Sequence, residues 1–262
     1  MSKVDFVSLK GERDSNEDNH NIIVDGDLKI KYYAVYDGHG GKFVSKFLSD
    51  NLPAFFTDKR TKYPLSNKYV NDVYDGIQNI LFTKYEKEVN ECGSTCLVVC
   101  SFKEMGQQYL NIINTGDSRC VLCRNNIAKI LTKDHKPDWP DEHNRISKLG
   151  GQIKKDGDIY RIGDLSVSRA FGDKSASKYV THRPDLYKYK LTKKDSFMII
   201  ACDGLWDVVQ PQDAINFVLS NCYDENMKQI NKDVNIARKL AERAIKLDSG
   251  DNVTCIIVFF TS

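Results

Sequence analysis

The 262-residue sequence lacks several features, and each absence excludes a class of protein. It has no apolar run of 18 residues and no basic start followed by an apolar stretch, which argues against a membrane span or an export signal. Lys plus Arg (38) nearly balances Asp plus Glu (36), so the net charge of +2 provides no long-range attraction for nucleic acid or anionic membranes. We expect a protein of the cytoplasm, with the nucleus as an alternative, that has neither nucleic-acid nor membrane partners.

Several catalytic and metal-binding patterns are also missing. No cysteine is followed by an arginine six positions later, so a cysteine-dependent phosphatase is excluded, and no G-x-x-x-x-G-K-[ST] nucleotide loop or EF-hand spacing occurs. Eight cysteines are present, and Cys120 and Cys123 have a C-x-x-C spacing. They lie in an alternating run in which residues three apart face opposite sides of a strand and cannot share one ion. We expect buried free thiols.

Strands and helices form separate groups along the chain, which favours an α+β fold with antiparallel sheets over a doubly wound parallel sheet. Apolar alternation and continuous apolar runs predict strands, and spacings of three and four predict helices. The second and third strands are expected to be joined by a turn at Asp25-Gly26-Asp27. Strands are expected at 4–10, 20–25, 29–37, 94–102, 108–114, 118–124, 127–131, 195–203 and 253–260, and helices from 42 onward, at 67–90, 141–149, 211–219 and 233–247.

The whole chain, 1–262, is expected to form one domain. Its least apolar stretch, 174–195, is expected to leave the core as a short flap, in which Pro184 could start an edge strand. One strand precedes residue 13 and two residues follow the last strand, so we expect no regulatory extension.

Acidic residues recur at strand ends or beside glycine in four separate places. They are Glu17-Asp18, Asp37-Gly38, Asp203-Gly204 and Gly250-Asp251. A single Asp-Gly is more often a turn, but four such sites in one chain indicate a shared function. At a sheet rim, glycine allows the backbone to approach a ligand closely.

If these carboxylates meet, their mutual repulsion would cost several kcal/mol unless a cation lies between them. Oxygen ligands suit Mg²⁺ or Mn²⁺, whereas zinc would favour His and Cys. Two ions that share a carboxylate can activate a water for in-line attack on phosphorus. Asp37 follows the most apolar early strand and is the best candidate for the shared ligand.

Seven motifs, in order along the chain, resemble those of the metal-dependent protein phosphatases, the PPM or type 2C family. The motifs are RDSNED (13–18), YDGHGG (36–41), GST (93–95), NTGDSR (114–119), LSVSRAFGD (165–173), CDGLWDV (202–208) and GDNVT (250–254). The resemblance covers almost the whole chain. It implies a four-layer α-β-β-α sandwich, in which two antiparallel sheets are flanked by helices and the metals lie in a cleft at one end.

The resemblance also implies a ligand set for two Mg²⁺ or Mn²⁺ ions. Asp37, Asp203 and Asp251 match the ligands of the first ion. Glu17, Asp37 and the carbonyl of Gly38 match those of the second, so Asp37 would bridge the two ions. Asp117 matches a ligand of a third, weaker site, which it would share with Asp203.

Arg13 matches the family's phosphate-binding arginine, whose planar guanidinium can hold two phosphoryl oxygens. His39 matches the residue that protonates the departing Ser or Thr oxygen, and an alkoxide leaving group needs such an acid. Other motif residues are expected to orient the ligands or waters through hydrogen bonds. They are Asp18, Thr95, Ser168, Arg169, Asp207 and Asn252.

The resemblance implies hydrolysis of phosphoserine and phosphothreonine in proteins, a reaction used in signalling, by an enzyme that we expect to be monomeric. Two alternatives stay open at this point. A chain with this fold could be an inactive binding or scaffold protein, although every ligand position here carries a competent group. It could also hydrolyse small phosphoesters instead of phosphoproteins. Metal-dependent turnover of a phosphopeptide would separate the three.

Overall fold

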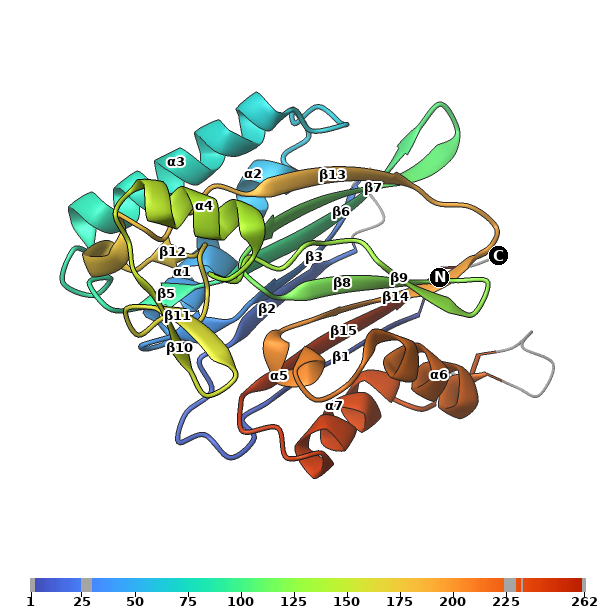
Figure 1. Cartoon of the computed structure of the whole chain (residues 1–262). Helices are drawn as coiled ribbons and strands as arrows, with labels where there is room; N and C mark the ends of the chain where they lie inside the picture. The colour runs from blue at the N-terminus through green and yellow to red at the C-terminus, as the bar shows by residue number, and fades with distance from the viewer. Residues whose placement is uncertain (1–2, 25–29, 224–229, 232, 261–262) are drawn as a thin grey trace.

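Two antiparallel sheets lie face to face, and helices cover the outer face of each (Figure 1). The computed structural model describes residues 3–24, 30–223, 230–231 and 233–260. The β14 sheet has the spatial order β1 (Val4–Leu9), β15 (Val253–Phe259), β14 (Asp195–Ala201), β8 (Arg119–Arg124) and β9 (Ile127–Ile130). The β6 sheet has the order β13 (Asp185–Lys190), β7 (Gln107–Thr115), β6 (Cys96–Glu104), β3 (Ile30–Tyr36) and β2 (Asn19–Ile23).

Side chains alternate across each strand, and the central strands β3, β6, β14 and β15 are buried on both faces. In β3, Tyr33 and Val35 enter the layer between the sheets, where they meet Met198 and Ile200 of β14. The intervening residues of β3, such as Tyr32, face the helices on the other side. Two buried faces explain why these strands read as continuous apolar runs, since burial of apolar surface is the main force that holds the layers together.

Helices close the two outer faces. The outer face of the β6 sheet packs against α1 (Phe43–Asn51), α2 (Pro53–Thr57) and α3 (Asn67–Lys84). The outer face of the β14 sheet packs against α5 (Asp203–Trp206), α6 (Pro211–Cys222) and α7 (Ile236–Lys246). Ser66 caps α3 by accepting a hydrogen bond from the backbone N–H of Tyr69 at 3.2 Å, and proline opens α2 and α6 at a position that needs no N–H donor.

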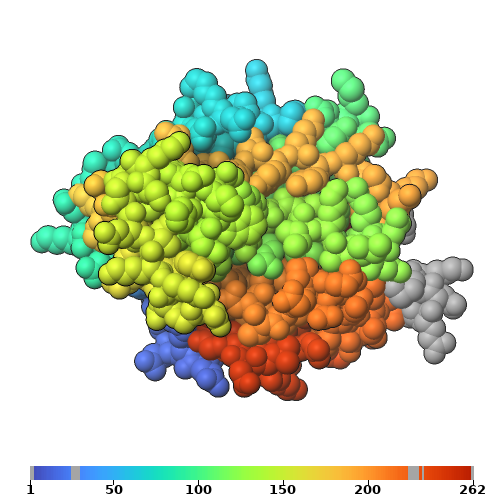
Figure 2. Space-filling view, viewed as in Figure 1, coloured from blue at the N-terminus to red at the C-terminus, as the bar shows by residue number. Residues whose placement is uncertain are grey.

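Smaller elements complete the fold at one end of the sheets. They are the short strands β4 (Gly38–His39), β5 (Gly93–Ser94) and β12 (Phe171–Gly172), the helix α4 (Pro140–Lys148), the hairpin of β10 (Ile153–Asp156) and β11 (Ile159–Ile162), and the 3₁₀ turn η1 (Lys174–Ala176). Figure 2 shows α4 and this hairpin, in yellow-green, as a separate lobe above the orange and red residues of the β14-sheet helices. A small apolar cluster of Ile146, Ile162, Val167 and Val180 holds the lobe together.

The four-layer α-β-β-α sandwich predicted from the sequence is confirmed. The antiparallel pairing of β2 with β3 is also confirmed, whereas the turn predicted at Asp25-Gly26-Asp27 lies outside the described residues. All eight cysteines are buried and free. Cys120 lies between the sheets and Cys123 lies on the helix side, as their odd spacing predicted.

The structure differs from the sequence prediction in the segment 174–195. Pro184 does precede an edge strand, but that strand, β13, pairs with β7 along its full length from Asp185 to Lys190 and so belongs to the β6 sheet. The part that leaves the sheets and reaches the mouth of the functional cleft is instead the β10–β11 hairpin, which the sequence did not predict. Among the described residues, no helix combines the length and apolarity needed to cross a bilayer.

Candidate metal centre

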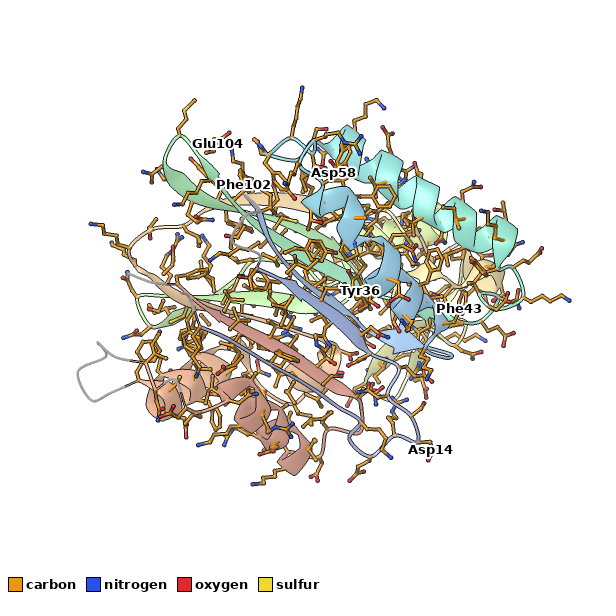
Figure 3. All side chains as sticks on the ribbon, turned by 180° about the vertical axis from the view of Figure 1, so that it is seen from behind. Asp14, Tyr36, Phe43, Asp58, Phe102 and Glu104 are labelled. Carbon is orange, nitrogen blue, oxygen red and sulfur yellow. The ribbon has the colours of Figure 1, made fainter. Side chains whose placement is uncertain are left out.

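A cleft of about 1110 Å³ opens at the end of the sandwich where β3 and β14 terminate. In the view from behind, Tyr36 at the end of β3 and Asp14 lie toward this end, whereas Phe102 and Glu104 lie at the opposite end (Figure 3). The cleft collects predicted residues from loops that are far apart in sequence. Its walls include Arg13, Glu17, Asp37, Gly38, His39, Thr95, Asp117, Asp203, Asp207, Asp251 and Asn252.

Three carboxylates meet at the floor of the cleft. One oxygen each from Asp37, Asp117 and Asp203 lies within 4.8 Å of the others, a spacing that a metal ion could bridge. The cluster combines the end of β3, the β7–β8 turn and the start of α5. Oδ1 of Asp117 is buried and has no hydrogen-bond partner, which is costly for a carboxylate oxygen unless a cation satisfies it. These oxygen-only donors fit a hard divalent cation.

Thr95 fixes the backbone of Asp37. The side-chain oxygen of Thr95 accepts a hydrogen bond from the Asp37 N–H at 3.2 Å, and the Thr95 N–H donates to the Asp37 carbonyl at 2.9 Å. The Thr95 hydroxyl also lies 3.0 Å from the Ser118 hydroxyl, next to Asp117. Thr95 therefore ties together the two turns that carry Asp37 and Asp117.

Asn252 positions the loop that carries Glu17. Its side-chain carbonyl accepts a hydrogen bond from the Glu17 N–H at 2.8 Å, and its amide donates to the carbonyls of Lys10 and Ser15 at 2.7 and 2.9 Å. The Glu17 carboxylate in turn accepts a hydrogen bond from the Gly41 N–H at 3.0 Å. Hydrogen bonds therefore fix both the backbone N–H and the side-chain carboxylate of Glu17.

The glycine after Asp37 is required by close packing. A Cβ atom at Gly38 would lie only 2.4 Å from the Glu17 carbonyl oxygen, so any larger residue would push the two loops apart. A Cβ at Gly204, directly after Asp203, would lie 2.0 Å from the carbonyl oxygen of Asn252. The Asp-Gly pairs that looked like ordinary turns in the sequence therefore allow backbone segments to approach each other around the cleft.

Burial and mutual repulsion perturb the carboxyl groups in the cleft. Burial, followed by the charges of Asp203 and Asp18, raises the pKa of Asp37 well above its usual value. Burial and the neighbouring Asp117 raise the pKa of Asp203 in the same way, although Lys136 opposes the shift. Burial raises the pKa of Asp18 to about 6. Without a cation, the folded protein thus holds protons on groups that are ionised in the unfolded chain.

The metal-free protein should therefore lose stability as the pH rises. Between pH 4 and 6, folded Asp18 keeps a proton that the unfolded chain releases, so the free energy of unfolding falls with rising pH, by about 2–3 kcal/mol for this group alone. Asp37 and Asp203 extend the loss to higher pH. Thermal unfolding in EDTA from pH 4.5 to 8 measures the effect. A melting temperature that increases across this range would contradict it, and Asp37→Asn should flatten the dependence.

Arg13 lies at the edge of the cleft beside Asp251. Its Nε donates to the Gly250 carbonyl at 2.8 Å, and its NH2 group donates to Asp251 Oδ2 at 3.0 Å. The side chain stays 58% exposed, so the guanidinium is held in place yet accessible from solvent. An exposed guanidinium beside a cluster of candidate metal ligands can bind an anionic phosphoryl group.

His39 makes its main contact with a residue that the sequence did not single out. Its Nε2 lies 2.8 and 3.0 Å from the two carboxylate oxygens of Asp173, whose side chain is almost completely buried. Burial lowers the pKa of His39, but the Asp173 hydrogen bond and the negative charges of Asp173, Asp117 and Glu17 outweigh it and raise the pKa above the usual value. The contact between Nε2 and Asp173 therefore favours the protonated imidazolium form of His39.

The remaining predicted residues occupy different positions. Asp18 lies buried behind the cleft and is close enough to Asp37 and Cys202 for a metal to bridge them. Asp207 lies at the end of α5 and lines the cleft. The side chain of Arg169 instead binds Glu142 of α4 and Asp185 of β13, and the Ser168 hydroxyl is buried without a partner. The direct hydrogen bonds of Arg169 thus hold the α4 lobe to the β6 sheet and do not reach the cleft.

The sequence prediction missed two basic residues in the cleft. Arg119 makes a paired contact with Asp134, with nitrogen–oxygen distances of 3.0 and 2.7 Å. Lys136 donates a short hydrogen bond to Asp117 and lies 3.9 Å from Asp203. Lys136 lies 19 residues after Asp117 in the sequence. No local pattern in Asp134-His135-Lys136 indicates that the Lys136 ammonium contacts the Asp117 carboxylate.

Comparisons with known proteins agree with this geometry. The family model for protein phosphatase 2C matches residues 2–253. A probable protein phosphatase 2C of Oryza sativa is 35% identical over 97% of this chain and 86% of its own length. A PP2C-like domain-containing protein of Acanthamoeba polyphaga mimivirus is 46% identical over 60% of this chain and 98% of its own length.

Solved structures show the same fold. A serine-threonine phosphatase 2C from Toxoplasma gondii superposes with a TM-score of 0.77 at 24% identity, covering 99% of this chain and 95% of its own. A C. elegans sex determining protein gives a TM-score of 0.86 at 25% identity, covering 98% of this chain and 64% of its own.

The chain belongs to the protein phosphatase 2C family. It is a metal-dependent serine/threonine phosphatase that acts on phosphoproteins.

Proposed function

We propose that the chain hydrolyses phosphoserine and phosphothreonine in proteins with two Mg²⁺ or Mn²⁺ ions bound in the cleft. The convergence of acidic side chains on one cleft, with one oxygen each of Asp37, Asp117 and Asp203 within 4.8 Å of the others, is the observation that carries this proposal, because carboxylates this close repel one another unless cations lie between them. We also propose one catalytic domain over 1–262, a monomer, and a cytoplasmic location, all of which rest on the sequence alone.

Asp37 is the ligand best placed to be shared between the ions. Asp203 and Asp251 complete the first set, and Glu17 with the Gly38 carbonyl completes the second, as the family resemblance implies. Bound divalent cations would supply Lewis-acid stabilisation of the phosphoryl charge and a water of lowered pKa. The Thr95 and Asn252 hydrogen bonds hold Asp37 and Glu17 in place before any ion binds.

The protein's own side chains account for phosphate binding and proton transfer. Arg13, anchored to Gly250 and Asp251, binds two oxygens of the phosphoryl group. Water attacks phosphorus, the bond from phosphorus to the Ser or Thr oxygen breaks, and that oxygen takes the Nδ1 proton of His39. The protons of the attacking water leave on the phosphate, which releases one to the solvent, and His39 regains a proton from the solvent before the next cycle. The products are inorganic phosphate and the free hydroxyl. Asp173 holds the imidazole through Nε2 and stabilises its protonated form before the transfer.

A phosphopeptide assay tests the proposal. We expect turnover of a phosphothreonine peptide in Mg²⁺ or Mn²⁺, loss of turnover in excess EDTA, and recovery when the ion is added back. Turnover that survives EDTA would overturn the metal centre. Binding of the peptide with no turnover in either metal would favour a scaffold protein, and turnover of small phosphoesters but not of the peptide would favour a small-molecule hydrolase.

A further inference from the structure

Lys136 places a positive charge inside the carboxylate cluster. Its ammonium donates to Asp117 Oδ2 and lies 3.9 Å from Asp203 Oδ2, so it sits between the two residues that were predicted to share a third, weak ion. The Asp117 side chain is almost completely buried, and the Lys136 side chain is 24% exposed. Among the residues that the structure describes, Lys136 is thus the one that forms ion pairs with both Asp117 and Asp203.

The backbone on both sides of Lys136 is fixed to the turn that carries Asp117. The His135 N–H donates to the Gly116 carbonyl at 3.0 Å, and the His135 ring Nδ1 accepts from the Gly116 N–H at 3.0 Å. The Ser168 N–H donates to the His135 carbonyl at 2.9 Å, and Pro137 restricts the backbone of Lys136, the residue before it. His135 is itself buried. Because this segment is held against Gly116, the ammonium is delivered to Asp117 at a high effective concentration.

We propose that Lys136 is the resident cation of the Asp117–Asp203 pair and that it competes with a third divalent ion. A divalent ion at this pair would need oxygens of both carboxylates, and Lys136 would have to give up its hydrogen bond to Asp117 and move away from the incoming charge. The inference rests on the proposed two-ion centre. It adds that the Lys136 ammonium prevents a third divalent ion from binding to Asp117 and Asp203 at ordinary metal concentrations.

Counting bound Mn²⁺ tests this directly, without measuring activity. Free Mn²⁺ is followed by electron paramagnetic resonance while the full chain is titrated. We expect wild type to bind two ions, and Lys136→Met to bind a third with a dissociation constant at least about tenfold lower than in wild type, or about 1.4 kcal/mol. Equal stoichiometry and affinity in wild type and Lys136→Met would overturn the proposal.

Matched variants test whether the effect is specific to Lys136 and whether the third ion binds at Asp117. Lys133→Met removes the same charge three residues earlier, where the ammonium pairs with the exposed Asp141 at 2.7 Å, and should leave Mn²⁺ binding unchanged. Lys136→Arg keeps a positive charge and should keep two ions. Adding Asp117→Asn to Lys136→Met should remove the third ion. A third ion that persists in the double variant would overturn the assignment to Asp117.

A second measurement applies even if Lys136→Met does not fold. Asp117→Asn removes charge from the cluster and should bind as many Mn²⁺ ions as wild type, because Asp117 in wild type pairs with the Lys136 ammonium and not with a metal ion. Loss of one ion in Asp117→Asn would overturn the proposal. Failure of wild type to bind any Mn²⁺ would instead refute the two-ion centre itself, so the two failures are distinguishable.

Discussion

Asp37→Asn is expected to lower phosphopeptide turnover by about 10³-fold or more, while the variant folds at least as well as wild type in EDTA. In the proposed mechanism Asp37 would hold the ions that stabilise the phosphoryl charge, and a loss of about 4 kcal/mol of that stabilisation corresponds to three orders of magnitude. The same change removes a carboxyl group that, in the metal-free protein, must either repel Asp203 and Asp117 or take up a proton on folding. The metal-free variant should therefore gain about 1–2 kcal/mol of stability.

Two measurements distinguish the loss of a metal ligand in Asp37→Asn from misfolding of the variant. Steady-state turnover in Mg²⁺ or Mn²⁺ measures the catalytic loss, and denaturant unfolding in EDTA measures the gain in stability. Asp72→Asn makes the same chemical change on the surface of α3, where Asp72 pairs with Lys68 at 2.6 Å, and should alter neither by much. Wild-type turnover in Asp37→Asn would exclude Asp37 as a shared ligand, and lower stability in EDTA would contradict the repulsion argument.

The sequence predicted the positions of Asp37, Asp203 and Asp251 because each adjoins a strand with a strong local signal. The apolar runs before Asp37 and Asp203 become β3 and β14, buried on both faces, and such strands can present polar groups only where they end. Asp251 precedes the equally apolar β15. Because β14 and β15 are neighbouring antiparallel strands, Asp203 and Asp251 could be expected at one sheet rim, whereas β3 lies in the other sheet and only the family resemblance predicted that Asp37 would meet them.

Contacts that depend on the three-dimensional path of loops could not be predicted in this way. Asp173 reaches His39 from 134 residues away, and it does so from a left-handed backbone conformation (φ 48°) that nothing in its motif requires. The β10–β11 hairpin has short, largely polar strands whose pattern resembles a loop, and it is held by the small cluster around Ile146 and Ile162. Conversely, β13 carries few apolar residues because it is an edge strand, so its polar sequence suggested an excursion.

His39→Ala is expected to reduce turnover of a phosphothreonine peptide by about 10²-fold or more, yet to reduce turnover of an aryl phosphate by less than about tenfold. The departing Thr oxygen is a poor leaving group and needs a proton, whereas an aryl oxide leaves without one. His39 is suited to supply it, because Asp173 binds Nε2 at 2.8 Å and raises the proton affinity of the ring against the effect of burial.

The ratio between the two substrates is the decisive measurement, because a structural defect in the cleft would reduce both rates together. Asp173→Asn should show the same selectivity in weaker form, since the imidazole stays in place but loses the charge that favours its protonated state. Its rate with the phosphopeptide should also decline at a lower pH than in wild type, because removing the Asp173 charge lowers the pKa of His39. Equal losses on peptide and aryl substrates in His39→Ala would exclude His39 as the proton donor.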